Sequence, residues 1–207
     1  MGRRTARVIS IIFHPLLMPT YAILLLFNVD SHYLMVLPSD YQLILLAFVF
    51  LFTFILPAIS MFFLLKLKVI DSLEMNSSKE RPIPLIIVAL FFYATYHLLR
   101  QFPVNTIFTV FMLGATLLVL FSLLINYLSK ISIHMVALGG LLGTFIGFSF
   151  LLHQDIRIYM YLIILISGIT GTARLGLDAH SSAQVYSGFG MGVFVMLGLF
   201  LFMNYSL

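Results

Sequence analysis

Cysteine is absent from this chain of 207 residues, and charged side chains make up only 9% of it. Without cysteine, the chain has neither a disulfide framework nor a thiolate metal site. The scarcity of charge, together with 62% apolar residues, excludes a soluble domain and indicates an integral membrane protein. The net charge of +4 forms no basic stripe, so we expect no nucleic-acid partner.

Long apolar runs fill most of the chain. A transmembrane helix needs about 20 such residues, and candidate spans lie at about 8–28, 43–65, 83–99, 104–128, 135–152, 156–173 and 187–205. Pro15 and Pro19 could kink the first run or make it re-entrant, so the prediction is six or seven spans. The runs are too long and too evenly apolar for barrel strands. We therefore expect an all-α polytopic bundle, with residues 1–207 forming a single membrane domain.

Basic residues mark one side of this bundle. Lysine and arginine gather before the first run and between runs two and three, four and five, and six and seven, whereas the opposite side has Arg100 and Arg157. The positive-inside tendency then places the N-terminus in the cytoplasm, and we expect a bacterial inner-membrane protein. Polar segments 79–81, 130–134 and 174–184 are separated by even numbers of spans. They therefore lie at one membrane face and are able to converge.

Glycine recurs at four-residue spacing in two of the runs. Gly139, Gly143 and Gly147 form one stripe, and Gly188 and Gly192 form another. Such stripes let helix backbones approach closely in lipid. A pre-organised site between these helices is no better supported by the pattern than close packing alone.

The most unusual polar stretch lies near the C-terminus. His180 and Gln184 are four residues apart and would share a helix face, so Gln184 can hold one imidazole nitrogen and leave the other as a nucleophile. Arg174 offers a planar fork of donors suited to phosphate, and Gly176 permits the bend that would bring it to His180. The structural alternative is an interfacial Arg174–Asp178 ion pair with His180 as a helix cap. The second histidine segment favours a functional site.

Two further segments supply candidates for the same site. His134 begins the fifth run and could protonate a leaving-group oxygen, while Ser132 could bind phosphate beside a helix N-terminus. Lys79 and Arg81 could complete a phosphate clamp. The alternatives are an interfacial His134 with Lys130 as an anchor, and a solvated loop around Lys79. Each alternative is the better interpretation of its segment taken alone.

The other histidines carry less information. His14, His32, His97 and His153 lie in the spans or at the opposite face, and we interpret them as packing or interfacial residues. No two histidines have the His-x-x-x-His spacing of a helical metal site. We therefore expect chemistry that needs no metal.

The pattern Arg174-x5-His180-x3-Gln184 resembles the third signature of the type-2 phosphatidic acid phosphatase superfamily, which includes dolichyl-diphosphatases and glucose-6-phosphatases. That signature reads Ser-Arg-x5-His-x3-Asp, with Gln at the last position in some branches. Here Ala173 replaces the serine.

The other two signatures are matched less fully. The second, Pro-Ser-Gly-His, is kept at Ser132 and His134. The first, Lys-x6-Arg-Pro, is kept at Arg81 and Pro82, whereas Glu74 stands at the lysine position. The resemblance covers about residues 79–200.

The resemblance implies a helical core of the acid phosphatase and vanadium haloperoxidase type. His180 would attack a phosphoryl group and form a phosphohistidine, and Arg174, Arg81 and Lys79 would stabilise the equatorial oxygens. His134 would protonate the departing oxygen, and no cofactor would be needed. The substrate would be a lipid phosphate or a polyprenyl diphosphate drawn from the lipid bilayer.

Two other functions compete with this one. Asp71-x-x-Glu74 before Arg81-Pro82 echoes the magnesium–diphosphate loop of UbiA-type prenyltransferases, although a second aspartate-rich motif is lacking. A non-catalytic membrane protein that keeps the phosphatase-like fold is the other. The head group, the lipid tail, the oligomeric state and the membrane face of the site stay open. Charge favours a cytoplasmic site, whereas phosphatases of this kind that recycle polyprenyl carriers generally work on the outer face.

Overall fold

A computed structural model of the chain describes residues 1–29, 38–73, 75, 77–152 and 155–206. Within these residues all regular structure is helical. The elements are, in chain order, α1 (Arg3–Ile12), the 3₁₀ helix η1 (Pro15–Leu17), α2 (Met18–Phe27), α3 (Ser39–Phe50), the π-helical turn η2 (Leu51–Ile55), α4 (Leu56–Lys66), α5 (Pro82–Leu99), α6 (Thr106–Asn126), α7 (Ile133–Leu152), α8 (Arg157–Gly176) and α9 (Ser182–Ser206).

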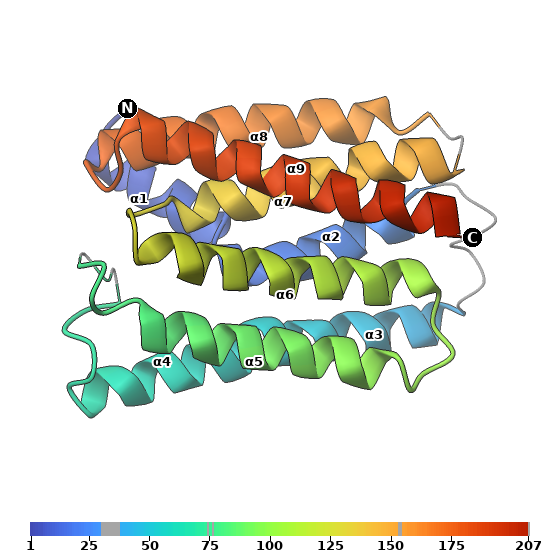
Figure 1. Cartoon of the computed structure of the whole chain (residues 1–207), viewed down its shortest axis with the longest axis horizontal. Coiled ribbons are helices and arrows are strands. Elements are labelled where there is room, and N and C mark those ends of the chain that lie inside the picture. The colour runs from blue at the N-terminus through green and yellow to red at the C-terminus, as the bar shows by residue number, and fades with distance from the viewer. Residues whose placement is uncertain (30–37, 74, 76, 153–154, 207) are drawn as a thin grey trace.

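The helices form one elongated bundle (Figure 1). In the described part of the chain, seven helical segments are long and apolar enough to cross a membrane, which confirms the predicted helical bundle of six or seven spans. Several segments extend beyond the predicted runs. The first begins at Arg3 and the last at Ser182, because polar residues at the ends of a span continue the helix without adding to its apolar run.

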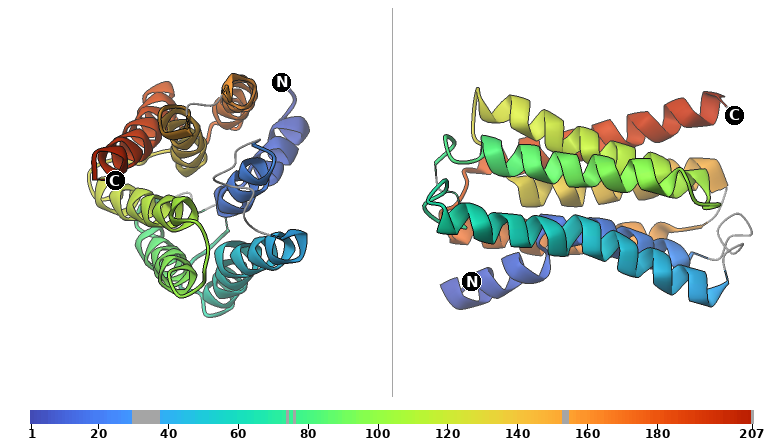
Figure 2. Two further views of the ribbon diagram at one scale, coloured as in Figure 1. Left: turned by 90° about the vertical axis from the view of Figure 1, so that its right-hand side faces the viewer. Right: turned by 90° about the horizontal axis from the view of Figure 1, so that it is seen from below.

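The first span is broken at His14, as its prolines predict. Pro15 has no N–H and hinders a helical conformation of the residue before it, so α1 ends at Ile12. The His14 Nδ1 accepts a hydrogen bond from the backbone N–H of Leu16 at 3.3 Å and caps η1. The Tyr21 hydroxyl donates to the Ile12 carbonyl at 3.0 Å. Because of this break, α1 turns away from the line of α2 (Figure 2).

A proline also shapes the second span. Pro57 follows the π-helical turn η2, and a proline ring clashes with the carbonyl four residues before it, here that of Thr53. A π turn is a common accommodation of such a local disturbance in a helix. The residues Phe54, Ala58 and Met61 next to this turn line the internal cavity described below.

The closest helix packing joins α7 to α9. A Cβ atom added at Gly139 or Gly143 would collide with the backbone of Phe189 or Val193 on α9. A Cβ atom at Gly192 would collide with the backbone of α7. The glycine stripes therefore bring two helices into backbone contact, in agreement with the packing interpretation of the four-residue spacing.

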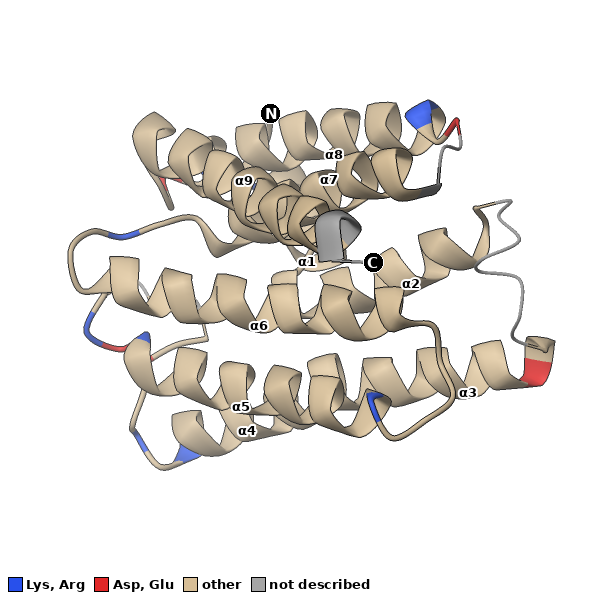
Figure 3. Cartoon of the chain, turned by 45° about the vertical axis from the view of Figure 1, so that its right-hand side comes forward, with Lys and Arg blue, Asp and Glu red and all other residues tan. Residues whose placement is uncertain are grey.

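The polar connections lie together at one end of the bundle. The α4–α5, α6–α7 and α8–α9 connections reach this end, as does the start of α1 (Figure 1). Most lysines and arginines also gather there (Figure 3), whereas within the described residues the basic residues at the other end are Arg100, which follows α5, and Arg157, which begins α8. The three polar segments that the sequence predicted to share a face do share one.

Replacing Gly192 by alanine should destabilise the bundle, because the added methyl group meets rigid backbone on α7. We expect a loss of about 1–3 kcal/mol, the usual cost of overpacking a core. Gly190→Ala on the same helix is the matched control, since a Cβ atom there meets nothing within 4 Å. Thermal unfolding in detergent should show a clearly lower midpoint for Gly192→Ala only; equal midpoints for the two variants contradict this packing.

Candidate active site

A cavity of about 860 Å³ opens between the helices near the polar end of the bundle. This volume falls within the range of ligand pockets, about 300–1,000 Å³. Much of its wall is apolar and comes from η2, α4, α5, α6 and α7. Its polar lining residues are Arg3, Arg7, Ser10, His14, Arg81, Ser122, Lys130, His134, Arg174, Asp178 and His180.

His180 lies in the short connection before α9 and is held there by the helix start. Ser181 caps α9: its hydroxyl accepts from the Gln184 backbone N–H at 3.4 Å, and the Gln184 Oε1 accepts from the Ser181 backbone N–H at 3.2 Å. This reciprocal pair is a capping box. The predicted shared helix face is wrong, because His180 precedes the helix. The predicted His180–Gln184 contact nevertheless forms.

The contact with Gln184 determines which nitrogen of His180 is protonated. The His180 Nδ1 lies 3.1 Å from the Gln184 Oε1, the same oxygen that accepts from the Ser181 backbone N–H. An oxygen acceptor requires a hydrogen on Nδ1, so in the neutral ring the lone pair is on Nε2. His180 is 8% exposed and lines the cavity. It therefore offers an oriented nucleophilic nitrogen.

The surroundings of His180 keep it neutral. Burial lowers the pKa of His180 to about 4; the hydrogen bond to Gln184 opposes this shift, and the charges of Arg174, Arg81 and Lys130 add to it. The ring is therefore uncharged at neutral pH and keeps the free Nε2 lone pair that a nucleophile needs.

Basic side chains tie together the three connections at this end. Arg81 is buried and donates from Nε to the Met75 carbonyl and from Nη1 to the Ile131 carbonyl, both at 3.2 Å. Lys130 donates from Nζ to the Ala179 carbonyl at 3.4 Å. Burial and neighbouring positive charge lower the pKa of both Arg81 and Lys130. Both side chains line the same cavity.

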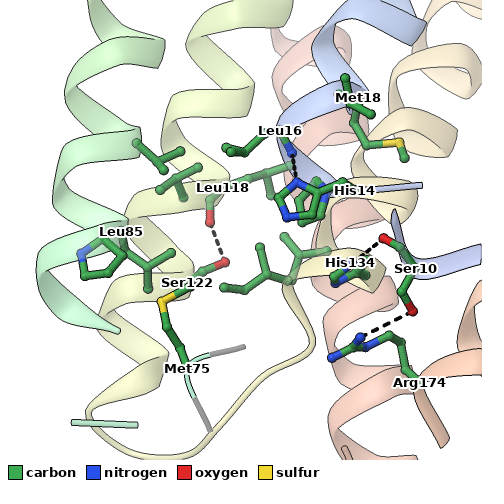
Figure 4. A pocket seen from close by; sticks show the side chains of 18 of the residues that line it. Ser10, His14, Leu16, Met18, Met75, Leu85, Leu118, Ser122, His134 and Arg174 are labelled. Atoms are coloured by element: carbon green, nitrogen blue, oxygen red, sulfur yellow. Dashed lines mark hydrogen bonds between the residues drawn. The ribbon is translucent and has the colours of Figure 1, made fainter. Parts of the chain in front are cut away.

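Arg174 and His134 meet at a residue of the first helix. Arg174 donates from Nη1 to the Ser10 hydroxyl at 3.3 Å, and the His134 Nε2 lies 3.1 Å from the Ser10 carbonyl oxygen (Figure 4). The His134 ring also lies beside the ring of His14, with centroids 5.6 Å apart and planes at 78°. His14 was interpreted from the sequence as a packing or interfacial residue; it lies instead in the cavity wall.

The turn between Arg174 and His180 differs from the expected one. Gly176 is the last residue of α8, and Asp178 adopts the left-handed conformation, with φ of 55°. Aspartate is one of the few residues other than glycine that tolerate this conformation. Asp178 pairs with Arg3 at 3.2 Å, with both side chains largely exposed, rather than with Arg174.

Two of the candidate phosphate-binding residues lie away from the cavity lining. Lys79 is exposed in the α4–α5 connection and is not part of the cavity wall. Ser132 is completely buried beside α9, where its backbone N–H donates to the Gln184 carbonyl at 3.3 Å. In the described part of the chain its hydroxyl has no hydrogen-bond partner. Lys130, considered from the sequence chiefly as an anchor, is the lysine that lines the cavity.

The acidic loop shows no metal site within the described residues. Asp71 is exposed outside the cavity wall, and its backbone N–H donates to the Glu80 carboxylate at 3.3 Å. Glu74 lies outside the described residues. No group of three histidine, aspartate or glutamate side chains in the described part of the chain is placed to hold a metal ion.

Of the remaining histidines, His97 lies in α5 and is exposed, whereas His32 and His153 lie outside the described residues. Ser10 and His14 were missed because each looks ordinary alone. The signal was their spacing: Arg3, Arg7, Ser10 and His14 would lie along one face of a helix.

In comparisons with known proteins, no family model matches the chain, and no curated protein or solved structure matches it. The resemblance to the lipid phosphatases in the sequence therefore stays a prediction.

The pKa of His180 predicts a pH dependence of definite sign. An unfolded histidine takes up its proton near pH 6.5 and folded His180 near pH 4, so the unfolded chain binds more protons between these values. His180 should therefore lower the stability of the fold as the pH falls through this window. An NMR titration, with the ring assigned from His180→Gln, should give a midpoint near 4. Gln184→Glu should raise it, because a carboxylate favours the imidazolium; a wild-type midpoint near 6.5 contradicts the account.

Proposed function

We propose that this protein is a membrane phosphatase that hydrolyses a lipid phosphate or polyprenyl diphosphate through a phosphohistidine on His180. One observation carries the proposal: an oriented neutral imidazole shares a cavity with three basic side chains, and that cavity continues between apolar helices. The three basic side chains are Arg81, Lys130 and Arg174, which are those of the five basic lining residues whose charges act on His180. A nucleophile beside converging cations suits phosphoryl transfer, in which charge stabilisation is the main requirement.

The proposed reaction has two steps. The Nε2 lone pair of His180 attacks phosphorus, and the bond from phosphorus to the lipid oxygen breaks. His134, which lines the same cavity, is the candidate general acid in its doubly protonated form, which a bound phosphate anion favours: Nε2–H stays on the Ser10 carbonyl, and Nδ1 gives its proton to the departing oxygen. Water then attacks the phosphohistidine and returns a proton to Nδ1 of His134, the P–N bond breaks, and inorganic phosphate leaves.

The basic residues would serve as the clamp for the phosphoryl oxygens. Arg81 and Arg174 each present several donors in a plane, which suits phosphate, and Lys130 adds a third charge. In this proposal Lys130 takes the role predicted for Lys79, because Lys79 lies outside the cavity wall.

The apolar wall supports a lipid as the substrate. Beyond the basic groups the cavity is lined by residues such as Leu85, Phe92, Phe111, Leu118 and Met196. A hydrocarbon chain drawn from the bilayer can lie against this surface at little cost, because both environments are apolar. A water-soluble phosphate ester would leave that part of the cavity without a partner.

The same cavity would also suit a non-catalytic protein that binds an anionic lipid, and the experiment below separates the two. No observation within the described residues favours the prenyltransferase. With the basic end of the bundle in the cytoplasm, as the distribution of lysine and arginine favours, the site would open at the inner face.

Phosphate release tests the proposal directly. Purified protein in detergent, with EDTA present, is given phosphatidic acid and polyprenyl diphosphate; wild type should release phosphate, and His180→Ala should release none above background because the nucleophile is gone. His97→Ala, an exposed histidine outside the cavity wall, is the matched control and should keep wild-type activity. Activity that survives in His180→Ala, or is absent from well-folded wild type across the panel, contradicts the proposal.

A matched pair of basic residues tests the clamp. Arg81→Ala should lower kcat/KM by about 100-fold or more, in line with the loss of one stabilising donor from an active site. Lys79→Ala should leave kcat/KM nearly unchanged, because Lys79 is exposed and lies outside the cavity. Arg81→Lys keeps the charge and separates electrostatics from a loss of folding. Equal losses in Lys79→Ala and Arg81→Ala would be inconsistent with this clamp.

A further inference from the structure

The first helix, together with the residue that caps η1, carries polar side chains that line the site. Arg3, Arg7, Ser10 and His14 all line the cavity, although the residues of the recognised signatures begin only at Arg81. The opposite face of α1 is apolar and exposed; Val8 is 54% exposed there. An apolar outer face and a polar inner face fit a helix that meets lipid on one side and a ligand on the other.

Ser10 connects the helix to two candidate site residues at once. It is 7% exposed; its hydroxyl accepts from Arg174 on α8 and its carbonyl oxygen lies 3.1 Å from the Nε2 of His134 on α7. A carbonyl can only accept, so the neutral His134 ring carries its hydrogen on Nε2 and keeps its lone pair on Nδ1. One residue of α1 thus fixes the direction of a guanidinium group and the tautomer of an imidazole (Figure 4).

His14 has a nitrogen available to a ligand. Its Nδ1 accepts from the Leu16 backbone N–H, so the neutral ring carries its hydrogen on Nε2. Within the described residues no hydrogen-bond acceptor is recorded for that N–H, while the ring lines the cavity next to His134. A donor beside a cation cluster, in a cavity, is suited to an anionic oxygen.

We propose that α1 and His14, which follows it, form a functional part of this site. Ser10 positions Arg174 and His134, and His14 donates a hydrogen bond from Nε2 to an oxygen of a phosphorylated amphiphile. The choice of ligand rests on the function proposed above. The site is then built from α1 as well as from the connections before α5, α7 and α9, and it extends beyond residues 79–200.

The test measures binding rather than hydrolysis. Decylphosphonate, which has no ester bond to cleave, is titrated into the full-length protein in detergent by calorimetry, with decanol as the probe that lacks the anionic group. His14→Asn keeps a side-chain oxygen that caps η1 but removes the Nε2 donor. Ser10→Ala removes the hydroxyl that holds Arg174, and Ser10→Thr restores it. Val8→Ala on the opposite face of α1 is the control.

His14→Asn and Ser10→Ala should each weaken decylphosphonate binding about tenfold or more, as expected for a lost hydrogen bond to a charged group. Ser10→Thr should recover most of the affinity, Val8→Ala should match wild type, and decanol binding should change in none of them. Unchanged phosphonate affinity in His14→Asn and Ser10→Ala, or no phosphonate binding by wild type, overturns the inference.

The outcomes of this test are separable from those of the phosphatase proposal. If wild type releases no phosphate but phosphonate binding depends on Ser10 and His14, the phosphatase proposal fails and the role of α1 stands. If phosphate release requires His180 while phosphonate binding is indifferent to Ser10 and His14, the role of α1 fails alone.

Discussion

Electrostatic repulsion among basic side chains is the constraint on which the rest of this structure depends. Arg81, Lys130 and Arg174 meet at one end of a bundle that is otherwise apolar, and burial, with the neighbouring positive charges adding to it, lowers the pKa of Arg81, Lys130 and the nearby His180. Groups of like charge stay together only where the surrounding structure holds them. The same side chains supply part of that support, since Arg81 and Lys130 bind carbonyl oxygens of neighbouring connections.

The helices provide the rest of the support. Backbone contact between α7 and α9, made possible by Gly143 and Gly192, fixes the helix of His134 against the helix that follows His180. The break at His14 and Pro15 frees α1 from the axis of α2, so that Ser10 reaches both α7 and α8. Each departure from a plain helical span therefore helps to place a side chain of the site.

The helical fold and the convergence of the polar segments were predictable from the sequence, because a lipid environment imposes simple rules on the chain. Apolar runs of sufficient length must be helices, and even numbers of spans bring polar segments to one face. The His180–Gln184 contact also follows from local spacing. The capping box that places His180 ahead of α9 was also present in the sequence, as the helix-start spacing Ser181-x-x-Gln184, but the shared-face interpretation of His180 and Gln184 did not use it.

The other differences between the predicted site and the site in the structure arise from tertiary structure. Lys79 and Lys130 are equivalent as sequence signals, and only the paths of their connections decide that Lys130 lines the cavity. Ser10 and His14 belong to a run that reads as one apolar span, and their role depends on how the chain turns at Pro15. Ser132 matched a signature residue, yet the packing of α7 on α9 buries it outside the cavity lining.

The most direct test of the central claim is an experimental structure of the protein with decylphosphonate bound. The account predicts the phosphonate group between Arg81, Lys130 and Arg174, within reach of the His180 Nε2, with the alkyl chain along the apolar wall beside Leu118 and Met196. A phosphonate bound elsewhere, or a cavity that takes the alkyl chain with its anionic group directed away from these basic residues, would contradict it.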